Sequence, residues 1–274
     1  MVTKKLQTAY LSGAFGIFIG TGISQGSGLP GWEQLLLELI QIAEQNPLQK
    51  QKCDELRSLV KDPSKYLMVA EELKEILGSD LYKYIKHRFD DKAVNPSELL
   101  KKIIELKSRF IITTNYDTLI EKAYIMKQQS PNDLTYKDAS TINYNLLSGD
   151  RFLLKAHGDA RRTPSEIIIT EKDYRTILFK EVGYQSVLHV LFSTCHILFL
   201  GVSFNDPELK LLLGFIHNIF HGGSPDHFSY MSKEELTNTE VDRWRKDFNI
   251  NIIPYDKANN RKELEESIDE LLKL

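Results

Sequence analysis

The feature that most constrains the fold is an apolar segment, residues 14–19, that runs directly into the sequence Gly20-Thr21-Gly22. Apolar runs of this kind are typical of strands that are buried on both faces of a parallel sheet. Glycine at positions 20 and 22 lets the backbone turn tightly and brings main-chain N–H groups close to a phosphate. The segment therefore predicts a first strand leading into a phosphate-binding loop, with a tight turn that binds nothing as the alternative.

The residues after this turn argue against an ordinary dinucleotide-binding dehydrogenase. Residues 25–31 contain three glycines, so we expect a long loop and a helix that begins only near Trp32. The dehydrogenase pattern has its third glycine in register and an acidic residue about 20 residues further along. Here the third glycine is out of register, and residues 34–45 have the apolar spacing of a helix. A plain dehydrogenase is therefore disfavoured.

The length, composition and charge of the chain exclude several other classes. With 274 residues, of which 42% are hydrophobic and 27% charged, the chain has room for one large α/β domain carrying a smaller insert. The net charge is −3 and no basic cluster is denser than Arg161-Arg162, so we expect no nucleic-acid surface. The sequence has no apolar run of transmembrane length and no signal-peptide core. We therefore expect a cytoplasmic protein without a membrane segment.

Predicted strands and helices alternate along most of the chain. The expected strands are residues 109–117, 152–159, 166–170, 196–203, 226–231 and 249–254. The expected helices are residues 32–45, 96–107, 118–127, 171–180, 182–194, 207–220, 234–247 and 261–274, and residues 128–150 have no assignment. This order predicts one Rossmann-like α/β domain over residues 1–274, with a mostly parallel sheet and helices on both faces.

A stretch without strand-like alternation interrupts this order. Residues 47–91 are expected to form short helices broken at Pro63 and Gly78. We interpret them as a small helical insert of the kind that forms a lid. The preceding helix, residues 32–45, has one apolar stripe, which we expect to pack on the sheet.

Polar residues follow four of the predicted strands, at the edge where open parallel sheets bind ligands. They are Gly20-Thr21-Gly22-Ile23-Ser24, Thr114-Asn115-Tyr116-Asp117, His157-Gly158 and Gly201-Val202-Ser203. With Ser27-Gly28-Leu29-Pro30, their order and spacing resemble the sirtuin-like superfamily over most of the chain.

This resemblance implies roles for the matching residues. It implies a Rossmann-like domain that binds NAD⁺, with Asn115 and Asp117 at the nicotinamide and its ribose, and with His157 as the base. Asn115 and His157 are thus the catalytic candidates. The cofactor-binding candidates are Gly20, Thr21, Gly22, Ser24, Asp117, Gly201 and Ser203.

The chain also departs from the protein-deacylating sirtuins, which carry a four-cysteine zinc module. Its two cysteines, Cys53 and Cys195, cannot build that module, so we expect no metal. Gly31-Trp32-Glu33 replaces the acidic and arginine residues that usually follow the Ser-Gly-Ile-Pro element. The motifs Thr-Thr-Asn-Tyr-Asp and Leu-Leu-Lys-x-His-Gly-Asp are similar to those of the zinc-free, NAD-degrading branch of sirtuin-like domains in bacterial anti-phage defence systems.

The types of residue at these positions suit the cleavage of NAD⁺ on chemical grounds alone, independently of the family resemblance. Cleaving a nicotinamide–ribose bond passes through a ribosyl cation and expels a neutral leaving group. The Asn115 amide can hydrogen-bond a ribose hydroxyl or a water without adding charge, and His157 titrates near neutral pH. Asp117 could hold the nicotinamide carboxamide.

Each candidate also has a structural alternative. Asn115 could cap a helix that begins at Tyr116, and Asp117 could be a first-turn acid of that helix. His157 could be a satisfied histidine at a strand end. Ser203 and Asp206 could be a helix cap and its neighbour. An adenine-side contact from Tyr255 and Asp256 is a weaker hypothesis.

Three functions follow from these observations. The first is an NAD⁺ hydrolase that acts as the toxic effector of a defence system by depleting NAD⁺. The second is a transferase, a deacylase or an ADP-ribosyltransferase, that uses the same site. The third is a non-catalytic module that senses NAD⁺ or ADP-ribose and controls assembly. Because little of the chain remains for a sensor, we expect a homo-oligomer, or control by a separate protein or by a domain of a longer parent chain.

Overall fold

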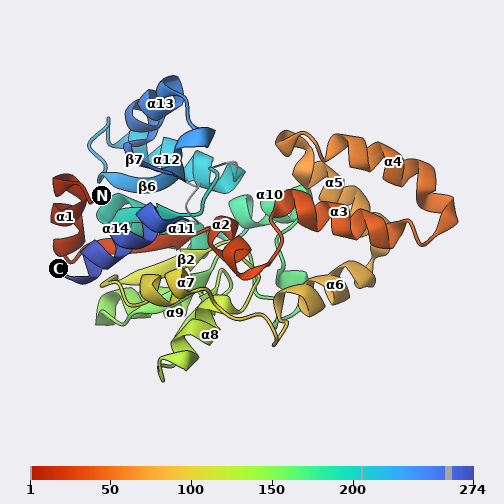
Figure 1. Cartoon of the computed structure of the whole chain (residues 1–274), viewed down its shortest axis with the longest axis horizontal. Coiled ribbons are helices and arrows are strands. Elements are labelled where there is room, and N and C mark those ends of the chain that lie inside the picture. Colours follow the sequence, from red (N-terminus) through yellow and green to blue (C-terminus); the bar gives the residue numbers. More distant parts are fainter. Residues whose placement is uncertain (1, 205, 257–260) are drawn as a thin grey trace.

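The structure, a computed structural model, describes residues 2–204, 206–256 and 261–274 (Figure 1). Its centre is a seven-stranded sheet in the order β3-β4-β2-β1-β5-β6-β7, in which every pairing is parallel. The strands are β1 (Phe15–Ile19), β2 (Phe110–Thr113), β3 (Asp133–Thr135), β4 (Phe152–Lys155), β5 (His196–Leu200), β6 (His227–Ser232) and β7 (Ile250–Tyr255). The predicted α/β, Rossmann-like fold is confirmed.

Helices cover both faces of this sheet. They are α1 (Lys4–Leu11), α2 (Thr21–Ser24), α3 (Trp32–Ala43), α4 (Lys50–Leu59), α5 (Tyr66–Leu77), α6 (Ser79–Phe89), α7 (Glu98–Ile103), α8 (Leu119–Met126), α9 (Ala139–Ser148), α10 (Glu171–Phe179), α11 (Val182–Thr194), α12 (Pro207–Ile219), α13 (Asn238–Phe248) and α14 (Lys262–Leu272). On one face α1, α7, α8 and α14 share a buried cluster with Ile17 and Ile111, and on the other α9 to α13 pack with Phe18 and Ile112. Successive side chains of β1 and β2 point to opposite faces of the sheet, and the core is therefore divided into two layers. Within the described part of the chain, no helix has the length and apolarity needed to cross a bilayer.

The helices α3 to α6 project to one side of the sheet (Figure 1, right). Within the predicted insert, the helix breaks lie where expected: Asp62 caps a 3-10 turn at Pro63–Lys65, and Gly78, with φ of +54°, separates α5 from α6. The expectation that the helix at 32–45 packs on the sheet was wrong. Its apolar stripe packs mainly against α4 and α5, because these helices supply buried apolar residues such as Leu56, Val69 and Leu73 to the same cluster.

Three other local expectations also differ from the structure. The turn after β1 becomes helical at once, as α2 followed by a 3-10 turn at Gln25–Ser27, before α3 begins at Trp32 as predicted. Residues 166–170 form no strand, because the Ile168 amide donates to the carbonyl of His157 in a loop rather than to a neighbouring strand (3.0 Å). The unassigned stretch 128–150 contains the edge strand β3 and the helix α9.

The strand order reverses beside β1. The chain first fills the sheet on the β2 side and then returns to add β5, β6 and β7 on the other side. In open parallel sheets the loops diverge at such a point and leave a crevice at the carboxyl ends of the strands. The four polar segments singled out in the sequence follow β1, β2, β4 and β5, which are neighbours in this sheet.

Candidate functional site

Glycines bring the loops after β1 and β5 into main-chain contact. The Gly22 amide donates to the carbonyl of Gly201 (3.0 Å), and a Cβ added to Gly22 would lie 2.8 Å from the Gly201 Cα. A Cβ on Gly20 would lie 2.4 Å from the Gly201 carbonyl oxygen. Packing of the two loops therefore already requires these glycines. The contact with a phosphate, by which the sequence analysis explained these glycines, stays a prediction.

A pocket of about 180 Å³ opens beside this contact, at the point where the strand order reverses. Of the predicted cofactor-binding residues, Thr21, Gly22, Gly201 and Ser203 line it. The opposite wall comes from β6, β7 and the residue before α14, and includes Tyr230, Ser232, Tyr255 and Arg261. Drug-sized ligands occupy pockets of roughly 300–1,000 Å³. In this conformation the pocket therefore has room for part of a dinucleotide.

Ser24 links the two polar residues that follow β2. The Asn115 Nδ2 donates to Ser24 Oγ (2.9 Å), and Ser24 Oγ donates to Asp117 Oδ2 (2.7 Å). All three side chains are buried. The Asn115 Oδ1 is also buried, and the described residues offer it no hydrogen-bond donor. Since buried amide oxygens are nearly always satisfied, this atom is suited to accept a hydrogen bond from a ligand hydroxyl or a water.

The structure decides one of the structural alternatives. The helix after β2 begins at Leu119, not Tyr116, and Asp117 Oδ1 rather than Asn115 accepts a hydrogen bond from the Leu119 amide (3.0 Å). The hypothesis that Asn115 is a helix cap was therefore wrong. Asp117 accepts from Ser24 and from Leu119, so its carboxylate also positions the loop.

His157 follows β4, the strand next to β2, after which Asn115 lies. Thr113 of β2 pairs with Lys155 of β4, and Asn115 and His157 each follow two residues later at the same edge of the sheet. The glycine after His157 has φ of +91°, and a Cβ there would lie 2.3 Å from the Glu166 carbonyl oxygen. Glycine at position 158 is thus needed for this turn. The structure brings Asn115, Ser24 and Asp117 into contact and places His157 on the neighbouring strand end.

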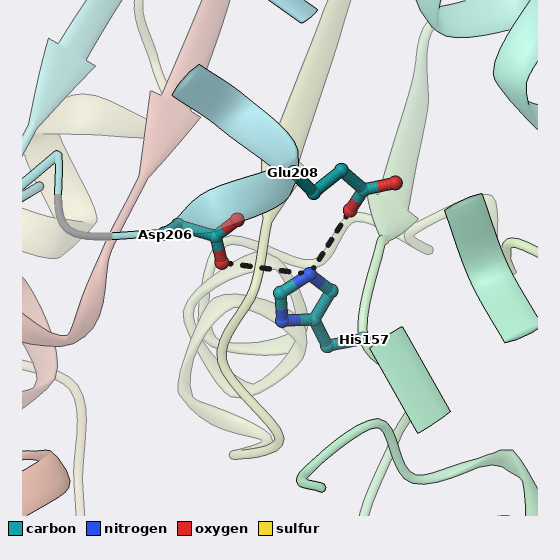
Figure 2. A group of neighbouring side chains, drawn as sticks. All are labelled: His157, Asp206 and Glu208. Atoms are coloured by element: carbon teal, nitrogen blue, oxygen red, sulfur yellow. Dashed lines mark hydrogen bonds and ion pairs between the residues drawn. The ribbon is translucent and has the colours of Figure 1, made fainter. Parts of the chain in front are cut away.

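Two carboxylates from the start of α12 face the His157 ring (Figure 2). The Nε2 lies 3.1 Å from Glu208 Oε2 and 3.7 Å from Asp206 Oδ2. The Tyr174 hydroxyl donates to Asp206 (2.8 Å) and lies 3.4 Å from His157 Nδ1. The ring nitrogens of His157 therefore have polar partners within the protein, as the structural alternative for this residue expected. A role in catalysis stays a prediction.

Sequence reasoning missed Glu208. Asp206 caps α12 by accepting from the Leu209 amide (3.1 Å), as its structural alternative required. An acid at the first turn of a capped helix is explained by the helix dipole alone, so nothing in the sequence marked Glu208 as a partner of His157.

These carboxylates shift the proton equilibrium of His157. Burial alone lowers the pKa of His157, but the charge of Asp206 and the hydrogen bond to Glu208 outweigh burial, and the pKa is raised. The imidazolium therefore stabilises the fold fully below the ordinary histidine pKa of about 6.5, and this contribution is lost as the pH rises through the raised pKa.

We expect Glu208→Gln to move the pH dependence of any reaction in which His157 is the base. A base must first be neutral, so the rate of the wild-type protein should rise with pH through the raised pKa of His157. Removing one of the two facing carboxylates lowers that pKa, while Asp206 and Tyr174 remain. The rising limb of the kcat profile should thus shift to lower pH, and an unchanged limb would contradict the role of Glu208.

Two groups of potential metal ligands occur among the described residues. One is His157, Asp206 and Glu208, and the other is Glu121, Asp133 and Asp159. In the second group the acids pair with Arg161, and neither group contains a cysteine. Cys53 and Cys195 are buried in the two separate core clusters. The expectation that no metal is bound stays a prediction.

An entirely parallel α/β sheet with a pocket at its strand reversal and buried polar groups on neighbouring strand ends is the arrangement typical of nucleotide-binding α/β proteins. Comparison with known families specifies the type. Residues 109–253, just over half of the chain, match the family model described as a SIR2-like domain. The chain belongs to this family, which confirms the sirtuin-like resemblance.

Curated relatives extend this similarity. The protein named NAD(+) hydrolase ThsA from Bacillus cereus (strain MSX-D12) is 29% identical over 228 residues, which cover 82% of this chain and 44% of the relative. ThsA from Acinetobacter baumannii (strain 532279) is 29% identical over 247 residues, covering 87% and 46%. Defense-associated sirtuin 2 from Bacillus subtilis is 23% identical over 220 residues, covering 79% and 20%. The chain thus spans less than half the length of these relatives.

Proposed function

We propose that this chain is an NAD⁺ hydrolase that cleaves the nicotinamide–ribose bond to give nicotinamide and ADP-ribose, as an effector of anti-phage defence by NAD⁺ depletion. The observation that carries the proposal is the buried Oδ1 of Asn115, which has no hydrogen-bond partner among the described residues. It lies at the strand end next to that of His157 and beside the strand reversal. The names of the relatives, NAD(+) hydrolase and defense-associated sirtuin, support it.

In the proposed reaction the bond between ribose C1′ and the nicotinamide nitrogen breaks, and its electron pair leaves with neutral nicotinamide. The Asn115 Oδ1 accepts a hydrogen bond from a ribose hydroxyl or from the attacking water, without a charge that would trap the substrate. Neutral His157 takes a proton from that water as the new C1′–oxygen bond forms. The carboxylates of Asp206 and Glu208 stabilise the resulting imidazolium.

Incubation of the purified protein with NAD⁺, with and without an acyl-lysine peptide, tests this proposal. Equal release of nicotinamide in both conditions, together with ADP-ribose, is the expected result. Release that depends on the peptide would instead support a transferase. Binding of NAD⁺ without release would support a non-catalytic sensing module.

The proposal assigns the pocket at the strand reversal to the nucleotide part of NAD⁺. Ser203 is exposed and lines this pocket, so Ser203→Trp should fill it without disturbing the core. We expect the Kd for NAD⁺, measured by calorimetry, to rise at least about tenfold. Ser130→Trp, at another exposed serine in the loop before β3, outside both the pocket and the insert, is the control. Unchanged affinity in Ser203→Trp would place NAD⁺ elsewhere.

We propose further that residues 1–274 act as one domain and that the helical insert at residues 47–91 acts as its lid. The Lys74–Asp173 ion pair (3.1 Å) joins α5 to α10, the helix that carries Tyr174 beside His157. Movement of the insert would therefore reach the site through α10. Hydrogen exchange of α5 with and without NAD⁺ tests this, since unchanged protection argues against a lid.

We propose that homo-oligomerisation regulates the activity. Exposed apolar side chains on α11 and α12, among them Val190, Leu211 and Phe215, support it. Light scattering against protein concentration, run beside the NAD⁺ assay, is the test. A strict monomer whose turnover is independent of concentration would refute this control.

A further inference from the structure

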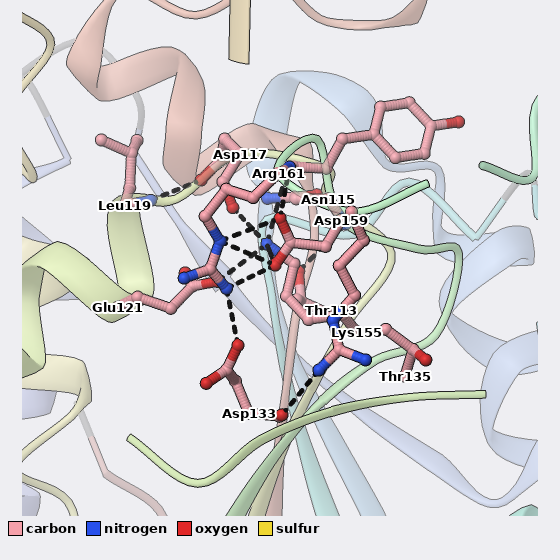
Figure 3. Close-up of polar contacts among 12 residues, drawn as sticks. Thr113, Asn115, Asp117, Leu119, Glu121, Asp133, Thr135, Lys155, Asp159 and Arg161 are labelled. Atoms are coloured by element: carbon pink, nitrogen blue, oxygen red, sulfur yellow. Dashed lines mark hydrogen bonds and ion pairs between the residues drawn. The ribbon is translucent and has the colours of Figure 1, made fainter. Parts of the chain in front are cut away.

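Lys155 is a charged side chain in the middle of the protein core. It is the last residue of β4, and its side chain is 1% exposed. Its Nζ donates to the main-chain carbonyls of Tyr116 (3.4 Å) and Asp117, and it pairs with Glu121 Oε1 (3.1 Å) and Asp159 Oδ2 (3.5 Å) (Figure 3). The ammonium therefore lies directly under the loop that carries Asn115 and Asp117.

The surrounding groups keep this ammonium charged. Burial alone lowers the pKa of Lys155, but the carboxylates of Glu121 and Asp159 outweigh it and raise the pKa. Arg161 covers the same two carboxylates, at 2.9 Å from Glu121 and 2.5 Å from Asp159. Burial opposes ionisation of Asp159, but the hydrogen bond from Arg161 and the charge of Lys155 lower the pKa of Asp159 to about 2.

The loop above Lys155 has no regular structure of its own. Residues 114–118 lie between β2 and α8 and form neither strand nor helix. The Tyr116 carbonyl also accepts from the Ala160 amide (3.0 Å), whereas the Asp117 carbonyl accepts from Lys155 Nζ and has no main-chain donor among the described residues. A buried carbonyl without a donor is costly, and the loop would shift to recover one. Such a shift would move Asn115 and Asp117 relative to Ser24.

We propose that Lys155 is a positioning residue for NAD⁺ cleavage: its ammonium holds the carbonyl of Asp117, and thereby keeps the loop that carries Asn115 in its productive position. This inference rests on the proposed function. The polar contacts of Lys155 include neither a pocket-lining residue nor His157. We therefore expect Lys155 to affect the rate of the chemical step rather than the affinity for NAD⁺.

Lys155→Met is the direct test. We expect kcat for NAD⁺ cleavage to fall about 10²-fold, the effect of a misplacement of about 1 Å, with little change in KM. Because this variant leaves Glu121 without its buried partner, the double variant Lys155→Met/Glu121→Met removes both charges and should fold while showing the same loss.

Lys122→Met is the matched control. The Lys122 Nζ also donates to two main-chain carbonyls, those of Asp91 (2.5 Å) and Val94 (2.9 Å), but these lie outside the site. We expect this variant to keep the wild-type kcat. Full kcat in either folded Lys155 variant, or an equal loss in Lys122→Met, would overturn the proposal.

A second readout separates this inference from the proposed function. Hydrogen exchange of residues 114–119 should become faster in the double variant and stay unchanged in Lys122→Met. If the wild-type protein does not cleave NAD⁺, the proposed function fails while this exchange still tests the loop. If the wild type cleaves NAD⁺ and exchange in the loop is unchanged in the double variant, only the inference on Lys155 fails.

Discussion

Replacing Asn115 with alanine is expected to lower kcat/KM for NAD⁺ cleavage about 10²-fold or more, the loss seen when one preorganised hydrogen-bonding group is removed from a transition state. The side chain contributes Oδ1, which has no partner among the described residues, and Nδ2, which donates to Ser24. Alanine removes the first group and leaves Ser24 still donating to Asp117. The fold should therefore be retained while the chemistry is lost.

Asn145→Ala is the matched control for this prediction. Asn145 on α9 is buried to nearly the same degree as Asn115, 5% against 4% exposed, and its Nδ2 also has no partner among the described residues. Nicotinamide release measured on both variants, with circular dichroism to check the fold, separates a specific role from the general effect of removing a buried amide. Wild-type activity in Asn115→Ala would remove the proposed mechanism.

The sequence predicts the sheet well because its strands are short apolar runs between clear turn signals. The strands β1, β2, β4 and β5 are buried along nearly their whole length, so their residues could belong to little else. Residues 167–169 are just as apolar, but these three isoleucines are buried in a loop. Apolar composition predicts burial, whereas the choice of hydrogen-bond partner depends on the whole fold.

The candidate site is predictable only in part, for a related reason. Asn115, Ser24 and His157 follow strands, and the parallel sheet places strand ends at one edge. Glu208 reaches the site from the first turn of a helix and looks like a dipole-stabilising acid in the sequence. Lys155 did carry a signal, since it is the charged residue at the end of the apolar strand Phe152–Lys155, but its partners Glu121 and Asp159 come from other segments.

His157→Gln is the second substitution from which we expect a large effect, a fall in kcat of about 10²- to 10⁴-fold, the range typical of a lost general base. Glutamine is preferred to alanine here. Alanine would leave the buried Glu208 Oε2 without its His157 donor, at a cost of about 1–3 kcal/mol in the free energy of unfolding. A glutamine amide can still donate to Glu208, but it cannot take up a proton.

His227→Gln completes this comparison. His227 is also buried, yet it lies at the start of β6, at the opposite edge of the sheet, where its Nδ1 accepts from the Ile197 amide (3.2 Å). Burial and the neighbouring His196 lower the pKa of His227 to about 3, so it is neutral at working pH and its replacement removes no charge. We expect full activity in His227→Gln and, in His157→Gln, a loss that no pH restores. Wild-type kcat in His157→Gln at neutral pH would exclude His157 from the proton transfer.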